Sequence, residues 1–429
     1  MTEVLTSSGG GGASAKAQGP VLYIGAVLPS LTETFVYREV LGLRERGWNV
    51  PIASVHAPAL DDSGGELASL ASEALPVYGL GAGRILARVA AECAARPVRT
   101  TRTLWRSVRD AVGGRDLRLV QRPKVLVQAL AAVAVAREAR SLGLRRVHAH
   151  MAHVPATIGM YLAQHLGVAF SFTGHANDLF QQRSLLAEKL SRADFVAAIS
   201  HWHREFYRSV VPDLTDAKMP IVRCGVDTEA FRDRGPARAA EELLISVGRL
   251  VEKKGFHVLI RALPAVLRSH PDVRLHLIGE GPERERLESL VRELGLESRV
   301  RFLGARSNDE VRRAVGEARV FALPCVRAAS GDKDGIPVVL MEAMALGVPV
   351  VAGALPAIRE LVDGTATGLL CEPGSVEDVE RALLELFGSS SARECLGSGG
   401  RRRVLEEFSA QVNLARLEDA LRAGARAAS

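Results

Sequence analysis

Aromatic residues make up only 5% of this 429-residue chain, and its five cysteines include no C-x-x-C pair. The scattered cysteines argue against a disulfide scaffold or a zinc site and favour reduced thiols in the cytoplasm. We find no recognised nucleic-acid motif and no platform of interleaved aromatic and basic residues, which makes nucleic acid a poor candidate partner. The cysteines are Cys93, Cys224, Cys325, Cys371 and Cys395.

The chain also lacks a long hydrophobic run and a targeting segment. Its longest apolar window, Val125 to Ala136, is interrupted by Gln128 and is too short to span a bilayer, so we predict a buried helix there. Residues 1–19 are rich in Gly, Ser and Ala, without a basic start or an apolar core. We expect a disordered tail rather than a signal peptide, and a cytoplasmic location.

Length and composition indicate a two-domain α/β protein. A chain of 429 residues exceeds what one core usually fills, so we expect two domains of roughly 200 residues each. An apolar content of 47% with few aromatics suits buried parallel strands. The net charge of +6 and the isoelectric point near 9.2 favour an anionic partner, such as a nucleotide sugar, a lipid phosphate or a membrane surface.

Strand-like and helix-like segments alternate in two series, which predicts doubly wound parallel sheets with right-handed crossovers. In the first series the strands are 21–27, 50–55, 147–151, 169–173 and 195–199, and the helices are 33–46, 84–111, 124–142 and a segment beyond Pro155. In the second series the strands are 244–248, 273–278, 300–303 and 320–323, and the helices are 255–269 and 282–294. The predicted parts are a tail (1–19), an N-terminal Rossmann-like domain (20–227), a linker (228–242), a C-terminal Rossmann-like domain (243–405) and a C-terminal helix (406–429).

The most informative segment is a loop and helix that carry two acids eight residues apart, Asp334 and Glu342. Gly335 and Pro337 break regular structure, and the apolar run from Val338 predicts a short buried helix ended by Gly347. The start of such a helix presents N–H groups and a positive dipole end to an anion such as a diphosphate. From spacing alone, a loop–helix boundary with a surface Asp and a structural Glu explains the segment equally well.

This segment resembles the Glu-x7-Glu signature of retaining glycosyltransferases of family 4, in the exopolysaccharide and colanic-acid branch. Here Asp334 stands in place of the first Glu. The resemblance implies a GT-B fold, with two Rossmann-like domains facing a central cleft. It makes 20–227 the acceptor domain and 243–405 the nucleotide-sugar donor domain, and it implies that the helix 406–429 packs back toward the N-terminal domain. It also implies a metal-independent, hexosyltransferase-type enzyme whose substrate is a nucleotide sugar and which needs no cofactor. The donor contacts it implies are Gly335, Ile336, Pro337, Val338 and Glu342, with Asp334 at the transferred sugar.

A basic pair follows the first strand of the second series. Arg249 and Lys254 would lie at the carboxyl edge of the sheet, where doubly wound sheets bind ligands, and an Arg fork with a Lys charge suits a diphosphate. A solvated basic turn is the alternative. The resemblance assigns both residues to the donor diphosphate and the leaving nucleotide, whereas we expect Lys253 to face solvent. Phe302 lies at a strand end where the resembled family meets the nucleotide base.

Histidines of the first series are candidates for the acceptor side. His175 follows a strand within Gly174-His175-Ala176-Asn177-Asp178, and the resemblance places it beside the transferred sugar; a structural histidine is the alternative. His150 could line the cleft, whereas His148 is expected in the core. Thr32 and Thr34, near the start of the first helix, are further acceptor or cleft candidates, although helix capping explains this segment too. Because neither histidine cluster has metal-ligand spacing or a carboxylate set nearby, we predict no metal site.

Three further segments are less specific. Gly279-Glu280-Gly281 is a Gly-rich turn that could border the nucleotide, and the loop 354–360 departs from the resembled family. The basic stretch from Arg84 to Lys124, interleaved with apolar residues, either rests on an anionic membrane or is a solvated Arg-rich face.

The sequence and the resemblance together predict retaining transfer of a sugar to a hydroxyl acceptor, carried by a lipid-linked or polysaccharide intermediate, in the cytoplasm or peripherally at the inner membrane face. The alternatives are a small-molecule or natural-product glycosyltransferase, a sugar-nucleotide epimerase or starch/glycogen-type synthase of the same fold, and a nucleotide-sugar-binding regulator without turnover.

Overall fold

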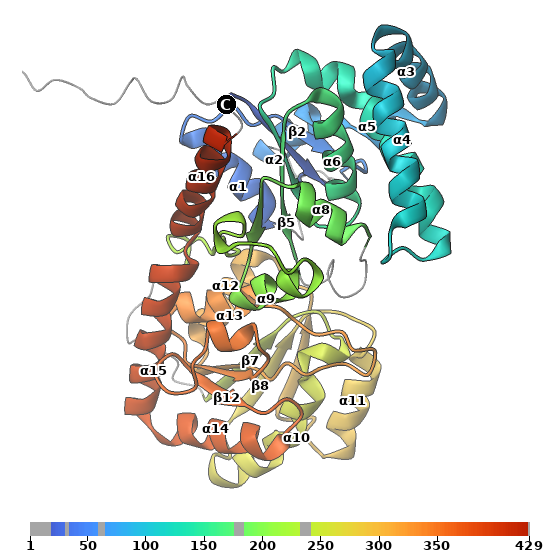
Figure 1. The fold of residues 1–429 in the computed structure, drawn as a ribbon. Helices are drawn as coiled ribbons and strands as arrows, with labels where there is room; N and C mark the ends of the chain where they lie inside the picture. The colour runs from blue at the N-terminus through green and yellow to red at the C-terminus, as the bar shows by residue number, and fades with distance from the viewer. Residues whose placement is uncertain (1–18, 31–33, 59–64, 176–183, 232–241, 428–429) are drawn as a thin grey trace, which may run out of the picture. The chain divides into compact units, whose positions relative to one another are not determined.

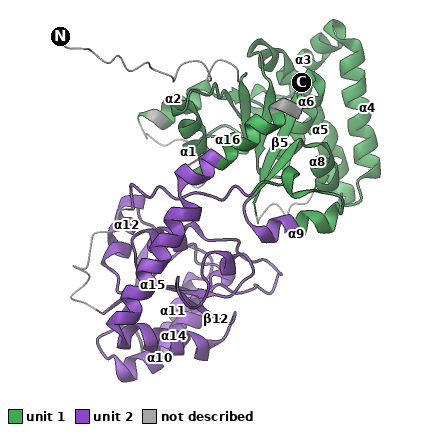
Figure 2. Cartoon of the chain, turned by 60° about the vertical axis from the view of Figure 1, so that its left-hand side comes forward, with its two compact units in different colours: residues 1–198, 206–220, 416–429 green, residues 199–205, 221–415 purple. Residues whose placement is uncertain are grey.

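The computed structural model describes residues 19–30, 34–58, 65–175, 184–231 and 242–427, which form two compact units (Figure 2). Unit 1 comprises residues 1–198, 206–220 and 416–429, and unit 2 comprises 199–205 and 221–415. Most of the predicted tail and of the predicted linker, 228–242, lies outside the described residues.

Unit 1 is built on a six-stranded parallel sheet in the order β3-β2-β1-β4-β5-β6. The chain moves outward from β1 in one direction and then returns to start again at β4. The point where this direction reverses is the switch point, at which open α/β sheets bind ligands. The strands are β1 (Val21–Gly25), β2 (Ile52–Ser54), β3 (Leu75–Pro76), β4 (Arg146–His150), β5 (Ala169–Gly174) and β6 (Phe195–Ala198).

Helices flank this sheet, and α4 lies at the outer edge of the unit in both views (Figures 1 and 2). The predicted single helix over 84–111 is wrong: it is two helices, because Pro97 has no N–H to donate and excludes the helical conformation from Arg96. The α-helices are α1 (Thr34–Glu45), α2 (Glu66–Glu73), α3 (Ala82–Ala95), α4 (Pro97–Gly113), α5 (Arg122–Ser141), α6 (Val154–Leu166), α8 (Leu186–Arg192) and α9 (His201–Val210), and the short 3₁₀ turns are η2 (Tyr78–Leu80), η3 (Leu119–Gln121) and η4 (Asp216–Lys218).

Helix α5 confirms the buried helix predicted over Val125 to Ala136. Its side chains at Val125, Ala129, Ala132 and Ala136 are fully buried in unit 1. Among the described residues, the segment 119–141 is long and apolar enough to cross a membrane, but half of its apolar window is packed inside the unit. The helical segment is therefore longer than the window Val125 to Ala136, which the sequence suggested is too short to span a bilayer.

Unit 2 repeats the same architecture, with the strand order β12-β11-β10-β7-β8-β9 and a switch point between β7 and β10. Strands β3, β11 and β12 were not predicted. The strands are β7 (Leu243–Val247), β8 (Arg274–Ile278), β9 (Val300–Gly304), β10 (Val320–Leu323), β11 (Val350–Gly353) and β12 (Leu369–Cys371). The helices are η5 (Glu252–Lys254), α10 (Phe256–Ser269), α11 (Arg284–Glu293), α12 (Asn308–Glu317), α13 (Val338–Ala345), η6 (Ile358–Glu360), α14 (Val376–Gly388), α15 (Ser390–Arg403) and the π-helical η7 (Val404–Phe408). The last helix, α16 (Ala410–Ala427), begins in unit 2 and continues into unit 1.

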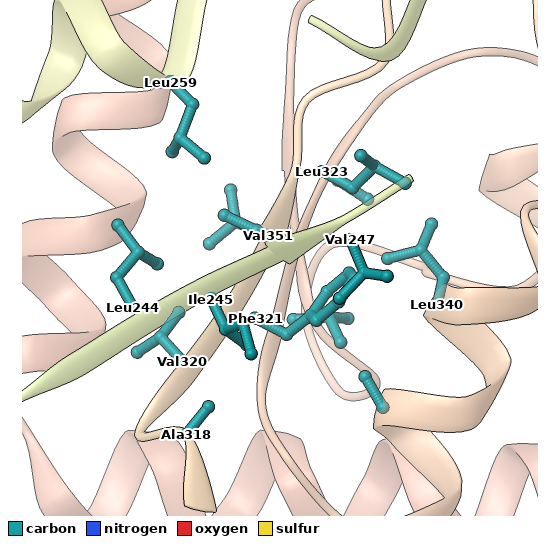
Figure 3. Packing of buried hydrophobic residues seen from close by; sticks show 14 of the residues in the cluster. Leu244, Ile245, Val247, Leu259, Ala318, Val320, Phe321, Leu323, Leu340 and Val351 are labelled. Atoms are coloured by element: carbon teal, nitrogen blue, oxygen red, sulfur yellow. The ribbon is translucent and has the colours of Figure 1, made fainter. Parts of the chain in front are cut away.

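The core of unit 2 fixes the helix that carries Glu342. Leu340 of α13 is fully buried in one cluster with Val247 and Phe321 of the sheet (Figure 3). Because a tightly packed core tolerates little displacement, this packing anchors α13 against the carboxyl ends of β7 and β10.

The predicted C-terminal helix, 406–429, is interrupted at Ser409, which is extended and pairs with Val226 in a parallel bridge. The N–H of Ala410 donates to the Val226 carbonyl at 2.8 Å. Residues from Arg416 onward belong to unit 1, where the Glu418 carboxylate accepts a hydrogen bond from Trp48 Nε1 at 3.0 Å. The chain thus passes between the units four times, after residues 198, 205, 220 and 415.

Candidate active site

The loops after β7 and β10 meet at the switch point of unit 2. Gly255 takes a left-handed conformation (φ 73°), and a Cβ there would lie 1.9 Å from the Pro324 carbonyl oxygen. The N–H of Val326 donates to the Lys253 carbonyl at 2.9 Å. Only glycine allows this approach, which brings the two lysines of η5 to the loop that follows β10.

Lys254 and Asp334, both predicted site residues, form a largely buried ion pair at this point. Lys254 Nζ lies 2.8 Å from Asp334 Oδ2, and the two side chains are 15% and 12% exposed. Burial alone would lower the pKa of Lys254, but the Asp334 charge outweighs it and raises that pKa overall. Burial likewise would raise the pKa of Asp334, but Lys254 lowers it. Both groups are therefore charged near neutral pH, and the pair places a fixed cation at the end of the sheet.

Lys253 and Asp332 extend this pair into a cluster of four charges. Lys253 Nζ lies 3.0 Å from Asp332 Oδ2 and 3.4 Å from Asp334 Oδ1, so the predicted solvent-facing Lys253 is wrong. Asp332 and Asp334 also have Asp-x-Asp spacing, a candidate metal motif that the sequence itself displays and that our prediction of no metal site wrongly took to be absent. Here each carboxylate has a lysine partner.

Arg249 differs from Lys254 in its surroundings. It follows β7 by two residues and is exposed. Among the described residues we find no ion pair or hydrogen bond of its guanidinium. Its five N–H donors can therefore turn to a phosphate without breaking an existing contact within the described part of the chain.

The predicted short helix is confirmed as α13, which begins after Pro337 and is followed by Gly347 with φ 68°. Val338 is its first residue, and the first N–H groups of a helix have no acceptor within it. Ile336 packs partly against the core, and Glu342 is half-buried just over one turn along the helix. Asp334 and Gly335 lie in the loop before it. The structure thus brings the acid pair, the helix start and Lys254 into one region of unit 2.

The glycine turn after β8 has a structural role. A Cβ on Gly279 would lie 2.0 Å from the Gly248 carbonyl oxygen, and one on Gly281 would lie 2.4 Å from that of Leu250. These glycines therefore let the loops after β7 and β8 pack backbone to backbone. Phe302 lies in the edge strand β9, half-buried, with the Arg284 guanidinium 5.8 Å from its ring centre.

In unit 1, a chain of hydrogen bonds runs from Tyr23 to His175. The Tyr23 hydroxyl donates to Glu39 Oε1 at 2.9 Å, and His150 Nε2 lies 2.7 Å from the same oxygen. His150 Nδ1 then lies 3.5 Å from His175 Nε2, at the end of β5. The structure thus brings together His150 and His175, both of which the sequence predicted as site residues. Thr32 and residues 176–183 lie outside the described residues, and only the backbone of Thr34 is described, as the first residue of α1.

Glu39 is the member of this hydrogen-bond chain that the sequence analysis did not identify. It lies on α1 next to the buried Val36 and Val40, so its only signal was a carboxylate near the apolar face of a helix. It corrects the prediction that no carboxylate lies near the histidines: ligand atoms of Glu39, His148 and His150 lie within 4.8 Å of one another. Hydrogen bonds account for this proximity. His148, in the core as predicted, has Nδ1 2.9 Å from Ser171 Oγ and Nε2 3.1 Å from Thr173 Oγ1.

Residues 227–403 match the family model of glycosyl transferases group 1. This part of the chain is a group 1 glycosyltransferase domain. It contains Arg249, Lys254, Phe302, Asp334 and Glu342, whereas the histidine chain of unit 1 lies outside it.

Curated relatives agree with the group 1 assignment. A GDP-mannose-dependent alpha-(1-6)-phosphatidylinositol monomannoside mannosyltransferase of Mycobacterium tuberculosis is 32% identical over 250 residues, 56% of this chain and 64% of the relative. The putative colanic acid biosynthesis glycosyltransferase WcaL of Escherichia coli is 37% identical over 201 residues, 46% of this chain and 48% of the relative. The chain therefore spans about half to just under two thirds of the length of these relatives. The resemblance to an exopolysaccharide-type glycosyltransferase is confirmed.

Solved structures extend the likeness to the whole fold. Sucrose-phosphate synthase from Thermosynechococcus elongatus superimposes with a TM-score of 0.71 over 96% of this chain and all of that one, at 20% identity. HepE from Anabaena, solved with UDP, gives a TM-score of 0.68 over 94% of this chain and all of that one, at 16% identity. The predicted GT-B class, with two Rossmann-like parallel-sheet domains, is confirmed.

Glu360 has a structural role that the sequence analysis did not identify. It lies in the atypical loop 354–360 of the group 1 domain. Its carboxylate accepts hydrogen bonds from the N–H groups of His201 and Trp202, each at 3.0 Å, and from Arg223 Nη1 at 2.8 Å. Burial would raise the pKa of Glu360, but these donors lower it. The carboxylate therefore caps the start of α9 and ties the segments 199–205 and 221–226 to unit 2.

Proposed function

We propose that this chain transfers a sugar from a nucleoside-diphosphate sugar to a hydroxyl group of a lipid-linked or polysaccharide acceptor, with retention of configuration and without a metal. The observation that carries the proposal is the buried Lys254–Asp334 pair at the switch point of the group 1 domain. Arg249 is exposed two residues after β7, which borders the same switch point.

The charges suit a departing diphosphate. Asp334 keeps Lys254 protonated and takes one of its three N–H donors, so the others remain available to phosphate oxygens. Arg249 adds a planar fork that can bind two oxygens at once. As the bond between the sugar and the phosphate breaks, negative charge grows on the leaving oxygen, and these cations stabilise it. In this proposal they do what a metal ion does in other enzymes.

The start of α13 and Glu342 would hold the rest of the donor. N–H groups at a helix start favour phosphate oxygens, and the Glu342 carboxylate can accept hydrogen bonds from two neighbouring ribose hydroxyls. Asp334 and His175 would attend the transferred sugar. None of these residues is placed as a covalent nucleophile. We therefore propose same-face substitution: the acceptor oxygen bonds to the anomeric carbon as the phosphate departs, and the acceptor proton passes to the departing phosphate oxygen.

The nature of the acceptor is supported by the relatives and by the surface of unit 1. The mycobacterial relative is named for a phosphatidylinositol mannoside, and the enterobacterial one for colanic acid. A basic stretch from Arg84 to Lys124 would suit reversible attachment to an anionic membrane. None of the five cysteines forms a disulfide, which supports a reducing cytoplasmic location.

A two-stage experiment tests this function. A panel of nucleotide sugars is first screened for thermal stabilisation, since a ligand at 100 times its dissociation constant adds ~2.7 kcal/mol to the free energy of unfolding. The best donor is then incubated with lipid-linked and soluble acceptors, and the anomeric configuration of the product is determined. We expect transfer to a lipid-linked or polymeric acceptor with retention. Binding without transfer or donor hydrolysis would favour a regulator, and conversion of the donor without an acceptor would favour an epimerase.

A further inference from the structure

Helix α4 is amphipathic in the reverse sense to a typical surface helix. Four of the five side chains that it buries are polar, namely Thr100, Thr103, Ser107 and Asp110, and the fifth is the small Ala111. Large apolar side chains on its opposite side are exposed, with Val98 at 78%, Trp105 at 69% and Val112 at 67%. A surface helix of a globular protein normally turns its apolar side to the core and its polar side to water.

Hydrogen bonds explain the inward polar side. Asp110 accepts two hydrogen bonds from Arg192, at 2.7 and 2.6 Å, and one from the Tyr161 hydroxyl at 2.9 Å. Thr103 Oγ1 lies 3.3 Å from His165 Nδ1, and His165 Nε2 lies 3.0 Å from Glu92 Oε1. Thr100 Oγ1 and Ser107 Oγ donate to backbone carbonyls, so each of the four buried polar side chains named above has a hydrogen-bond partner. The outward apolar side chains are exposed and therefore contribute little to the packing of unit 1.

The outward residues form one face. Val98, Trp105 and Val112 are seven residues apart, which is close to two helical turns, so they lie in a row. Arg102 and Arg109, both exposed, fall between them on the same side. Of the nine large apolar side chains that are exposed among the described residues, eight lie between 86 and 127, which makes this a concentration rather than the scattered exposure that every surface shows. We call Val98, Arg102, Trp105, Arg109 and Val112 the α4 face.

The charge around the α4 face has one sign. Residues 82–124 contain eleven basic and three acidic side chains, and each acid has inward partners. Glu92 pairs with Arg140, Asp110 pairs with Arg192, and the two carboxylate oxygens of Asp116 accept from the N–H groups of Leu185 and Leu186. The outward charge is therefore positive. A second copy of the same face would meet it with like charge, which disfavours self-association.

We propose that the α4 face docks on an anionic lipid surface. Trp105, Val98 and Val112 would enter the boundary between headgroups and acyl chains, while Arg102 and Arg109 reach the lipid phosphates. Tryptophan and apolar residues on one side, combined with arginine, are what an interfacial helix presents to a membrane. The proposal rests on the proposed function, because docking on a membrane would bring the enzyme to a lipid-linked acceptor. Docking itself can be measured without any sugar transfer.

Vesicle flotation of the full chain tests the surface. Wild-type protein is mixed with phosphatidylglycerol–phosphatidylcholine vesicles or with pure phosphatidylcholine vesicles, at low and at high salt. We expect binding to the anionic vesicles that weakens at high salt, because salt screens exposed charges. Tryptophan emission should shift to the blue on binding because of Trp105, since Trp48 is already buried and Trp202 lies in unit 2, not on α4. Failure to bind anionic vesicles at low salt would overturn the proposal.

Two sets of variants locate the contact. Arg102→Gln with Arg109→Gln should lower vesicle partitioning roughly 30-fold, from about 1 kcal/mol per basic side chain at the surface. The matched control, Arg286→Gln with Arg381→Gln, removes the same charge from two exposed arginines of unit 2 and should bind like wild type. Val98→Ser, Trp105→Ser and Val112→Ser together should abolish the blue shift and lower partitioning roughly tenfold or more. Leu405→Ser is their control, since Leu405 is exposed but lies in unit 2.

The outcomes separate this proposal from the proposed function. Nucleoside-diphosphate binding and unfolding temperature, measured on every variant, should remain as in wild type. If α4-face variants float like wild type, the proposal is wrong even if the enzyme transfers sugar. If docking behaves as expected but no donor supports transfer, the proposed function fails and the surface stands. Two other outcomes would overturn lipid docking and assign the face to a protein partner. One is a dimer in ultracentrifugation, and the other is binding to a polyglutamate column but not to vesicles, provided that the α4-face substitutions abolish it.

Discussion

The two units share a strand order but place different chemistry at their switch points. Unit 2 has a cluster of formal charges there, in which Lys253 and Lys254 face Asp332 and Asp334. Unit 1 has a chain of hydrogen bonds in which Glu39 is joined to His150, and His150 to His175. The same sheet topology thus carries ion-paired charges at one switch point and a chain of hydrogen bonds at the other. In the proposed function, the first would serve a charged leaving group and the second would position polar groups. A fold locates a site, and the side chains at the strand ends decide its chemistry.

The largest expected effect comes from removing the cations of unit 2. Arg249→Ala and Lys254→Ala should each lower kcat/KM by an amount equivalent to about 2–4 kcal/mol of transition-state stabilisation, because each removes a charge needed as the diphosphate departs. Steady-state kinetics with the best donor measure this. Arg249→Ala should leave the unfolding temperature unchanged because its side chain is exposed.

Lys254→Ala leaves a buried Asp334 without its main partner, so its activity is compared with that of Lys254→Ala/Asp334→Ala, which removes both charges. Near wild-type rates in Arg249→Ala or in the double variant would show that the diphosphate lies elsewhere.

The two acids of unit 2 should have separable effects. Glu342→Gln should weaken binding of a bare nucleoside diphosphate, whereas Asp334→Asn should mainly lower kcat, because the helix residue addresses the nucleoside and the loop residue the sugar. We expect roughly tenfold in affinity for the first, equivalent to about 1.4 kcal/mol. Calorimetry and kinetics distinguish the two. An equal loss of nucleotide affinity in both variants would contradict this division, and would point to Asp334 acting through Lys254, its partner at 2.8 Å.

In unit 1, Glu39→Gln should lower kcat while leaving nucleotide affinity unchanged. The amide keeps the shape of the side chain but weakens the charged hydrogen bond that orients His150, and through it His175. A loss of roughly 10- to 100-fold in kcat is expected for a mispositioned polar group. Glu45→Gln, an exposed position on the same helix, is the control. Unchanged kcat in Glu39→Gln would confine the hydrogen-bond chain to a structural role.

The smallest expected effect is that of a chelator. EDTA should leave transfer within about twofold of the untreated rate, because the cations at the unit 2 site come from side chains. The structure adds two places where this prediction could break: the Asp332–Asp334 pair and the group of Glu39, His148 and His150. Inactivation by EDTA that Mg²⁺ or Mn²⁺ restores would overturn the metal-free mechanism. Substituting Asp332 or His148 would then show which group binds the ion.

Local patterns account for the parts of the molecule that the sequence predicted. The alternation of strand-like and helix-like segments indicated both parallel sheets, and the break at Pro337 with Gly347 beyond it placed α13 to within a residue. The predicted single helix across Pro97 and the missed strands β3, β11 and β12 show where this approach fails. Short strands carry little pattern of their own and are stabilised by the neighbours with which they pair.

The sequence by itself determined the family of residues 227–403, the two Rossmann-like sheets and the residues expected at the donor site, because these depend on motifs and periodicity along the chain. Only the tertiary structure decided which charges meet. Lys253, expected in solvent, joins Asp332 and Asp334; Glu39 lies 111 residues from His150 and contacts it; Glu360 caps a helix that begins 159 residues earlier. It also decided that α4 turns its polar side inward, because the partners of that side, such as Arg192 and His165, come from distant elements. Ion pairs and burial depend on distances in space, which neighbouring letters do not encode.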